Sequence, residues 1–202
     1  MDDHVLAGMA KWPNVPAVYG WLALDRRGQW LIKGERIPNP VITDFIARNY
    51  EHDAGGNWFF QNGPQRVFVT LEYTPFVFRA ANAAGSALDL VAHTGARPQA
   101  LRGAWLDEHG SILLDTELGA GVLDDRDLDV IAAAFVDADG NPPDDDALDA
   151  LIDAAQRGED PALWVAHGRA RVKVGALRSS EVPGRFGYDA TPTAPAGHPE
   201  CT

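Results

Sequence analysis

Apolar and polar residues alternate over short stretches in the first part of the chain, and a period of two is typical of β-strands. Two such stretches, residues 21–24 and 29–33, flank the sequence Asp25-Arg-Arg-Gly28. Asp at the first position and Gly at the fourth favour a type I turn, so these residues are predicted to form a β-hairpin. Further strands are expected at residues 57–61, 65–71, 76–79 and 87–93.

A different spacing, with apolar residues three or four positions apart, predicts helices elsewhere. Asn39 and Pro40 are the expected start of one helix, because Asn caps free amide groups and Pro fits the first turn. The apolar positions that follow are Val41, Ile42, Phe45, Ile46 and Tyr50. Further helices are expected over residues 2–11, after a cap at Asp124 or Asp125, and over about 145–157.

The order of these elements returns in the second half of the chain. The Asp-x-x-Gly turn recurs at Asp107, at an offset of 82 residues from Asp25. Residues 171–174 (Arg-Val-Lys-Val) match residues 66–69 (Arg-Val-Phe-Val) at an offset of 105. An extra acidic helix in the second half explains why the offset grows from 82 to 105. We therefore predict an α+β fold of two tandem hairpin–helix–hairpin repeats, with mostly antiparallel sheets packed with helices and a flexible C-terminal tail.

This pattern divides the chain into three parts. An N-terminal α+β repeat unit with a short first helix is expected over residues 1–98, and a C-terminal unit with an acidic helical insertion over 99–179. Residues 180–202 are expected to be disordered, because they are rich in proline and hold few apolar residues after Tyr188.

The net charge of the chain indicates which kinds of partner it is expected to bind. The 202 residues include 17 Lys and Arg against 29 Asp and Glu, a formal net charge of −12. This balance argues against nucleic-acid binding, which needs clustered basic residues. No apolar stretch is long enough for a membrane helix, and the acidic start lacks the positive region of a signal peptide, so a cytoplasmic protein away from membranes is expected. The sole cysteine, Cys201, excludes an intramolecular disulfide.

Sequence motifs for common enzyme sites are missing. There is no Gly-x-Ser-x-Gly, no Gly-x-x-x-x-Gly-Lys phosphate loop and no His-x-x-x-His pair. No cofactor and no reaction are therefore assigned, and a non-enzymatic protein is favoured.

The nearest approach to a metal site is an acidic loop. Asp137, Asp139 and Asn141 occupy the first, third and fifth positions of a calcium loop, and Asp145 follows as a further oxygen donor. Pro142 stands where such a loop needs Gly, and the closing Glu is missing. A polar interhelix loop is therefore favoured over a calcium site, and Asp137, Asp139, Asn141 and Asp145 stay as candidate ligands.

Aromatic residues are dense between residues 30 and 78. Consecutive Trp58-Phe59-Phe60 on one strand must point to both faces of a sheet, so one face is covered by another layer or by a partner. If a small molecule binds here, the nearest polar groups are the candidate ligand-binding residues: Asn62, Arg66, Glu72, Tyr73 and His93.

Three stretches carry a family resemblance: residues 20–30 (Gly-Trp-Leu-Ala-Leu-Asp-Arg-Arg-Gly-Gln-Trp), 58–67 (Trp-Phe-Phe-Gln-Asn-Gly-Pro-Gln-Arg-Val) and 71–79 (Leu-Glu-Tyr-Thr-Pro-Phe-Val-Phe-Arg). In these residues the chain resembles an uncharacterised proteobacterial family of unknown function. It is also distantly similar to a second such family with a two-repeat α+β fold. The resemblance implies a repeated fold and a signalling or regulatory role, and it carries no catalytic signature.

These observations favour a cytoplasmic binding or regulatory protein with an unknown protein or small-molecule partner, and they leave homo-oligomers open. Two alternatives stay open. One is a small-molecule enzyme with a site between the repeats. The other is a calcium-responsive protein that uses the acidic loop 137–146.

Overall fold

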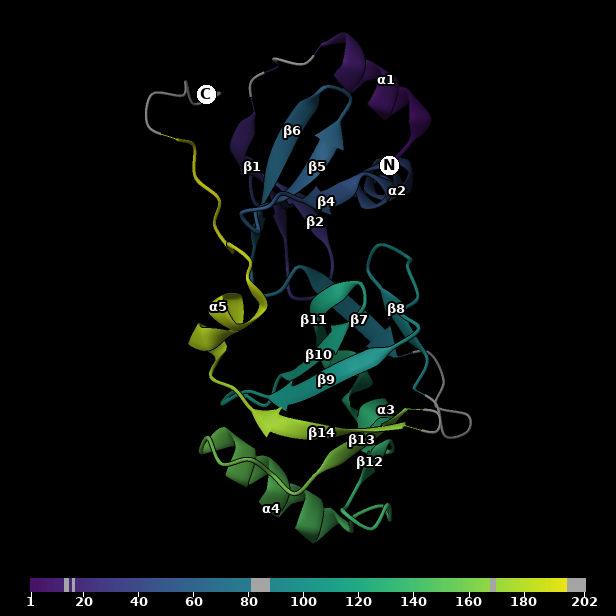
Figure 1. Cartoon of the computed structure of the whole chain (residues 1–202), viewed down its shortest axis with the longest axis vertical. Helices are drawn as coiled ribbons and strands as arrows, with labels where there is room; N and C mark the ends of the chain where they lie inside the picture. The colour runs from purple at the N-terminus through teal and green to yellow at the C-terminus, as the bar shows by residue number, and fades with distance from the viewer. Residues whose placement is uncertain (13–14, 16, 81–87, 168–169, 196–202) are drawn as a thin grey trace. The chain divides into compact units, whose positions relative to one another are not determined.

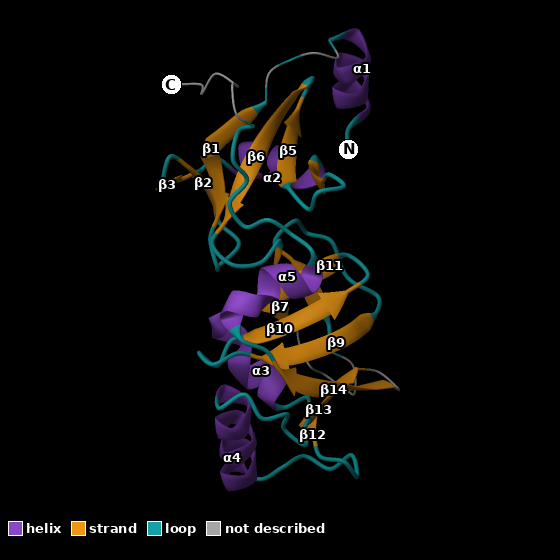
Figure 2. Cartoon of the chain, turned by 60° about the vertical axis from the view of Figure 1, so that its left-hand side comes forward, coloured by secondary structure: helices purple, strands orange, loops and turns teal. Residues whose placement is uncertain are grey.

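The computed structural model describes the chain except residues 13–14, 16, 81–87, 168–169 and 196–202. It divides into two compact units (Figure 1). The first contains Met1–Pro75 and Gly187–Thr202, and the second contains Phe76–Phe186. Each unit is built on one β-sheet with helices beside it (Figure 2), so the expected α+β class is confirmed.

The first unit contains a six-stranded sheet in the order β3-β2-β1-β6-β5-β4. Neighbouring strands are antiparallel except for the central pair, β1 and β6, which is parallel. The strands are β1 (Val18–Leu24), β2 (Trp30–Ile32), β3 (Glu35–Arg36), β4 (Tyr50–His52), β5 (Trp58–Asn62) and β6 (Gln65–Leu71). Two helices, α1 (Asp3–Lys11) and α2 (Pro40–Arg48), belong to the same unit.

Helix α2 begins as its sequence predicts and ends earlier. The Asn39 side chain accepts a hydrogen bond from the Val41 amide at 2.9 Å. Asn49 ends the helix, and its buried side chain donates to the Phe45 carbonyl and accepts from the Asp2 amide. Tyr50, which we expected on the helix, therefore lies at the start of β4.

The second unit contains an eight-stranded sheet in the order β12-β13-β14-β9-β10-β11-β7-β8. Its parallel pairs are β9 with β14 and β7 with β11. The strands are β7 (Phe76–Ala80), β8 (Leu90–Ala92), β9 (Leu101–Leu106), β10 (Ile112–Thr116), β11 (Gly119–Leu123), β12 (Phe135–Val136), β13 (Trp164–His167) and β14 (Ala170–Ala176). The helices are α3 (Leu128–Ala132), α4 (Asp145–Gln156) and α5 (Val182–Phe186), with short 3-10 helices at Asp125–Asp127 and Ser179–Glu181.

One segment belongs to a different sheet from the one that the sequence indicates. Strands β7 and β8 fall within residues 1–98, which we expected to form the N-terminal unit, yet they extend the sheet of the second unit. The parallel pairing of β7 with β11 joins residues that are more than forty positions apart, and no local pattern in the chain specifies such a pair.

Four turns share one geometry, and an aspartate starts each of them. The carbonyl of the aspartate accepts the amide of a glycine three residues later, and its Oδ1 accepts the amides two and four residues later. Each glycine has a positive φ, between 74° and 91°, that other residues rarely adopt. The four turns begin at Asp25, Asp53, Asp107 and Asp137.

Residues 180–195 differ from the disordered tail that the proline content predicts. The buried Tyr188 hydroxyl donates to the Tyr73 carbonyl at 2.7 Å, and the Leu71 amide donates to the Ala190 carbonyl at 2.8 Å. These bonds attach residues 187–195 to the first unit, while residues 180–186 belong to the second. Cys201 lies outside the described residues.

A carboxylate clasp fixes the start of the last helical segment in the second unit. Glu108 accepts hydrogen bonds from the Ser179 hydroxyl at 2.7 Å and from the Ser179 amide at 2.8 Å. These bonds, the hydroxyl first, lower the pKa of Glu108 from its ordinary 4.5 to about 2.

We expect Glu108→Gln to lower the free energy of unfolding by about 1–2 kcal/mol at neutral pH, because hydrogen bonds to a charged acceptor are lost. A lowered pKa contributes stability above pH 4.5 that disappears as the pH falls towards 2, so the difference between the two proteins should shrink over that range. Urea unfolding at several pH values measures this difference.

Glu159→Gln is the matched control, since Glu159 is exposed and its ion pair with Arg157 lies at the surface. If the difference in unfolding free energy between Glu108→Gln and the native protein were the same at neutral and acid pH, the stabilising role of the Glu108 carboxylate would be contradicted.

Candidate functional site

Two neighbouring strands of the first unit carry side chains to opposite faces of its sheet. In the antiparallel register of β5 and β6, Phe60 pairs with Val67 and Gln61 pairs with Arg66. Successive residues of a strand point to opposite faces, and paired residues share a face. One face therefore presents Phe60 and Val67, and the other presents Gln61 and Arg66.

An apolar groove lies on the Phe60 face, between helix α2 and the sheet. Its volume is about 360 Å³. Ile42 and Ile46 of α2 form one wall, and the sheet supplies Trp21, Ile32, Phe60 and Val67. Asn62 and Gln65 are the polar residues that line it. We call this site the α2 groove.

The α2 groove leaves large apolar side chains in contact with water. Ile32 and Ile42 are each 45% exposed although both line the groove, while Ile46 beside them is only 2% exposed. Helix α2 thus buries one end of its apolar face and leaves the other end open. A ligand in the groove would remove this surface from water, which is the main source of apolar binding energy.

A lysine is held beside the groove by an unusual backbone conformation. Lys33 has a φ of 49°, and it is the one non-glycine residue of the described chain with a positive φ. Its Nζ lies 3.8 Å from the ring centroid of Trp21, a groove residue. Glu35 pairs with Ile32 across the adjoining turn, so a carboxylate lies near the same edge. The edge of the groove therefore carries both charges.

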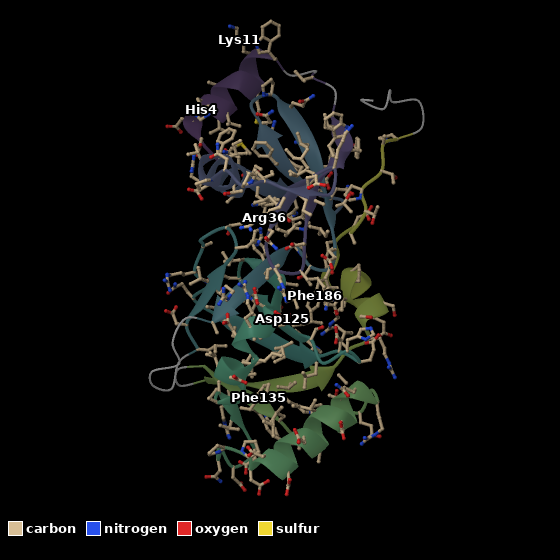
Figure 3. All side chains as sticks on the ribbon, turned by 180° about the vertical axis from the view of Figure 1, so that it is seen from behind. His4, Lys11, Arg36, Asp125, Phe135 and Phe186 are labelled. Atoms are coloured by element: carbon tan, nitrogen blue, oxygen red, sulfur yellow. The ribbon has the colours of Figure 1, made fainter. Side chains whose placement is uncertain are left out.

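A second cavity, which is lined by polar and apolar residues, lies on the opposite face of β5 and β6. Its volume is about 450 Å³, and its lining residues are Met9, Trp12, Val15, Ala17, Gln61, Pro64 and Arg66. Helix α1 reaches this place because it packs at the β5–β6 turn and beside α2, where His4 (labelled in Figure 3) stacks on Phe45 with ring centroids 5.7 Å apart. We call this site the Gln61 cavity.

The structure separates the five ligand-binding candidates of the sequence. Asn62 lines the α2 groove, and Arg66 lines the Gln61 cavity. Glu72 follows the far end of β6, about 20 Å along the strand from Arg66. There its carboxylate accepts the Arg26 amide at 3.0 Å, and the Arg26 guanidinium lies 4.1 Å from the Tyr73 ring centroid.

The fifth candidate, His93, belongs to the second unit. Its Nδ1 accepts the Val77 amide at 3.3 Å, and its ring lies 5.9 Å from the ring of Phe76. Burial lowers the pKa of His93 to about 3, so the imidazole is neutral at physiological pH. These contacts support a structural histidine.

The acidic loop uses its oxygens for local structure. Asp137 Oδ1 accepts the amides of Asp139 and Asn141, each at 2.9 Å. Asp144 caps helix α4 by accepting the Ala147 amide, and Asp145 lies in the first helical turn. In the described parts of the chain, no three His, Cys, Asp or Glu side chains come together in a group that could hold a metal ion.

Gln61 is the residue of these sites that the sequence analysis missed. It follows three aromatic residues on β5 and is 1% exposed. A polar residue at the end of a continuous apolar run is a signal for a buried polar group. The pattern alone does not tell whether a neighbour satisfies that group.

None of the helices in the described part of the chain has the length and apolarity that a membrane span requires.

Two solved structures align with this chain. A DUF1285 family protein from Silicibacter pomeroyi DSS-3 aligns with a TM-score of 0.55 and 12% sequence identity, over 81% of this chain and 85% of that one. A DUF1285 family protein from Shewanella baltica OS155 aligns with a TM-score of 0.44 and 18% identity, over 55% and 90%. The first alignment shows a similar fold. No curated protein matches the chain.

The expected similarity to two uncharacterised families is confirmed, and it assigns no reaction to this chain. The family model DUF2944, described as "Protein of unknown function (DUF2946)", matches residues 1–193, so the chain belongs to this family.

Proposed function

We propose that the protein is a binding protein and that its α2 groove holds a small apolar molecule. The observation that carries this proposal is the groove itself, in which Ile32 and Ile42 line an open, apolar space while remaining 45% exposed. Its volume of about 360 Å³ falls within the range of small-molecule pockets, which are concave and mainly apolar.

The walls of the groove support a small molecule over a flat protein surface. Helix α2 and the sheet enclose the space from two sides, and residues of both contribute to its lining. Side chains on two rigid elements give a ligand contacts on opposite sides, which a planar patch does not offer.

The polar groups of the groove favour binding over catalysis. Asn62 and Gln65 carry amides, which donate and accept hydrogen bonds but do not exchange protons at neutral pH. General acid–base chemistry needs a group that titrates near the working pH, such as histidine or a perturbed carboxyl group. The groove lining supplies recognition and orientation.

We also propose that the two sheets are two copies of one repeat, as the sequence pattern suggested. The order β3-β2-β1-β6-β5-β4 has a counterpart in β11-β10-β9-β14-β13-β12. Both series have a single parallel pair at their centre, β1 with β6 and β9 with β14. In this scheme the hairpin β7–β8 is an addition to the edge of the second copy.

The aspartate turns support the same correspondence. Asp25 directly follows β1, and Asp107 directly follows its counterpart β9. In the same way, Asp53 follows β4 and Asp137 follows β12. The second pair starts the sequences Asp-Ala-Gly-Gly-Asn and Asp-Ala-Asp-Gly-Asn, at an offset of 84 residues. Since the offset is 105 at Arg66 and Arg171, the insertion falls after Asn141 and contains helix α4. The acidic loop is then the second copy of a structural turn.

This correspondence predicts the behaviour of the acidic loop. We expect Asp53→Ala to cost about 1 kcal/mol of unfolding free energy, because two backbone amides lose their acceptor. Asp137→Ala should destabilise in the same direction, and calcium should change neither result. Thermal unfolding with calcium and with a chelator measures both. Asp139→Ala, which leaves the Asp137 carboxylate in place, is the control, and a calcium-dependent rise in Tm that Asp139→Ala removes would instead support a cation site.

The α2 groove is tested with octanol as an uncharged apolar probe in titration calorimetry. We expect Ile42→Asp to weaken octanol binding by about tenfold, because an ionised carboxylate replaces an apolar wall. Val41→Asp is the matched control. Val41 is the neighbouring residue in the first turn of α2, is 73% exposed and is not among the residues that line the groove. Both variants place a negative charge where a helix tolerates it, so both should fold.

Equal octanol binding by the native protein and Ile42→Asp would contradict the proposal, as would no binding by the native protein. Equal loss in both variants would show that the exposed surface of α2 binds the probe outside the groove.

A further inference from the structure

The Gln61 cavity contains a buried oxygen that accepts no hydrogen bond from the described residues. Gln61 is 1% exposed, its backbone amide donates to the Asn49 carbonyl at 2.8 Å, and its Nε2 donates to the Gly63 carbonyl at 2.8 Å. No hydrogen bond from any described residue reaches its Oε1. Exchanging the amide oxygen and nitrogen would place oxygen against the Gly63 carbonyl, so the geometry assigns the oxygen to the open position.

Such an acceptor is costly unless something supplies a donor. Buried carbonyl oxygens are nearly always hydrogen-bonded, because their interaction with water is lost on burial. Gln61 lines a cavity of about 450 Å³, which is large enough for a small molecule. A ligand with an N–H or O–H group would complete the hydrogen bonding of this side chain.

An arginine lies on the neighbouring strand, on the same face of the sheet as Gln61. Arg66 is the cross-strand partner of Gln61, and β-carbons of such pairs are about 5 Å apart. The Arg66 guanidinium rests 4.6 Å from the ring centroid of Phe59, and the side chain lines the cavity. The nearby carboxylate of Asp53 is engaged in its own turn, and Arg66 forms no ion pair with any described residue.

The other walls are apolar. Met9, Trp12 and Pro64 line the space, and a second cation lies near it, since Lys11 Nζ is 5.7 Å from the Trp12 ring centroid. Figure 3 labels Lys11 at the end of α1. The cavity thus combines a buried acceptor, an arginine and an apolar wall, which is a different chemistry from that of the α2 groove.

We propose that the Gln61 cavity binds a small carboxylic acid that carries an N–H or O–H donor on the adjacent carbon and an apolar side chain. The carboxylate binds the Arg66 guanidinium, the donor binds Gln61 Oε1, and the side chain packs on Met9 and Trp12. Apolar α-amino acids and α-hydroxy acids share this chemistry. Gln61 and Arg66 leave the same face of neighbouring strands, so one small molecule can contact both side chains.

Titration calorimetry on the full chain with four related compounds tests the proposal. Leucine and α-hydroxyisocaproate carry both polar groups, isocaproate lacks the donor, and leucinol lacks the carboxylate. We expect at least one of the first two to bind, and each compound that lacks a group to bind about tenfold more weakly. Whichever of leucine and α-hydroxyisocaproate binds with the higher affinity identifies whether the cavity prefers an N–H or an O–H donor.

Two variants locate the binding. Arg66→Met should weaken the binding of the carboxylates by about tenfold, because it removes the guanidinium. Since Arg66 is exposed, we expect the variant to fold. Arg171→Met is the matched control, because Arg171 is the equivalent exposed arginine of β14 and lies in the second unit. Gln61→Met should remove the difference between α-hydroxyisocaproate and isocaproate, and its thermal unfolding shows whether it has folded.

The proposal is overturned if none of the four compounds binds the native protein at millimolar concentration, or if all four bind equally. It is also overturned if Arg66→Met binds as the native protein does, or if Ile42→Asp abolishes binding in place of Arg66→Met. The last result would assign the compounds to the α2 groove and leave the binding function proposed there in force.

Discussion

The antiparallel register of β5 with β6 holds both candidate sites of the first unit in place. It sets Phe60 opposite Val67 and Gln61 opposite Arg66, so each pair faces a different side of the sheet. A slip of β6 by one residue would turn Val67 towards the cavity and Arg66 towards helix α2, while Phe60 and Gln61 kept their faces. The short turn through Gly63, with its positive φ, limits such a slip, and the Gln61 side chain bonds to that turn.

Helices α2 and α1 form the remaining walls of the two sites. Helix α2 covers part of the apolar face, where its Phe45 packs edge-on against Phe60 with ring centroids 5.4 Å apart. It leaves the remainder open as the α2 groove. Helix α1 packs at the β5–β6 turn and closes one side of the Gln61 cavity with Met9. The two sites therefore share two strands but use different helices. A ligand in one site leaves the other site free to bind its own ligand.

Local chemistry in the sequence predicted several elements well. The helix start at Asn39 and Pro40 and the hairpin turn at Asp25 both appear as expected, because each depends on hydrogen bonds within a few residues. The end of α2 and the placement of β7 and β8 could not be read in the same way. Asn49 ends the helix with help from the amide of Asp2, and β7 pairs with β11, so both depend on residues distant in sequence.

The candidate sites show the same division. Residue types alone made Asn62 and Arg66 candidate binding residues and indicated that the aromatic run must use both faces of a sheet. Only the tertiary structure separated Asn62 from Arg66, placed Glu72 and Tyr73 at the other end of β6, and put His93 in the other unit. Only it showed that Gln61 is buried without a donor for its oxygen among the described residues. Sequence determines which groups a chain carries and which local turns they favour, while burial and the meeting of distant strands decide which of them share a site.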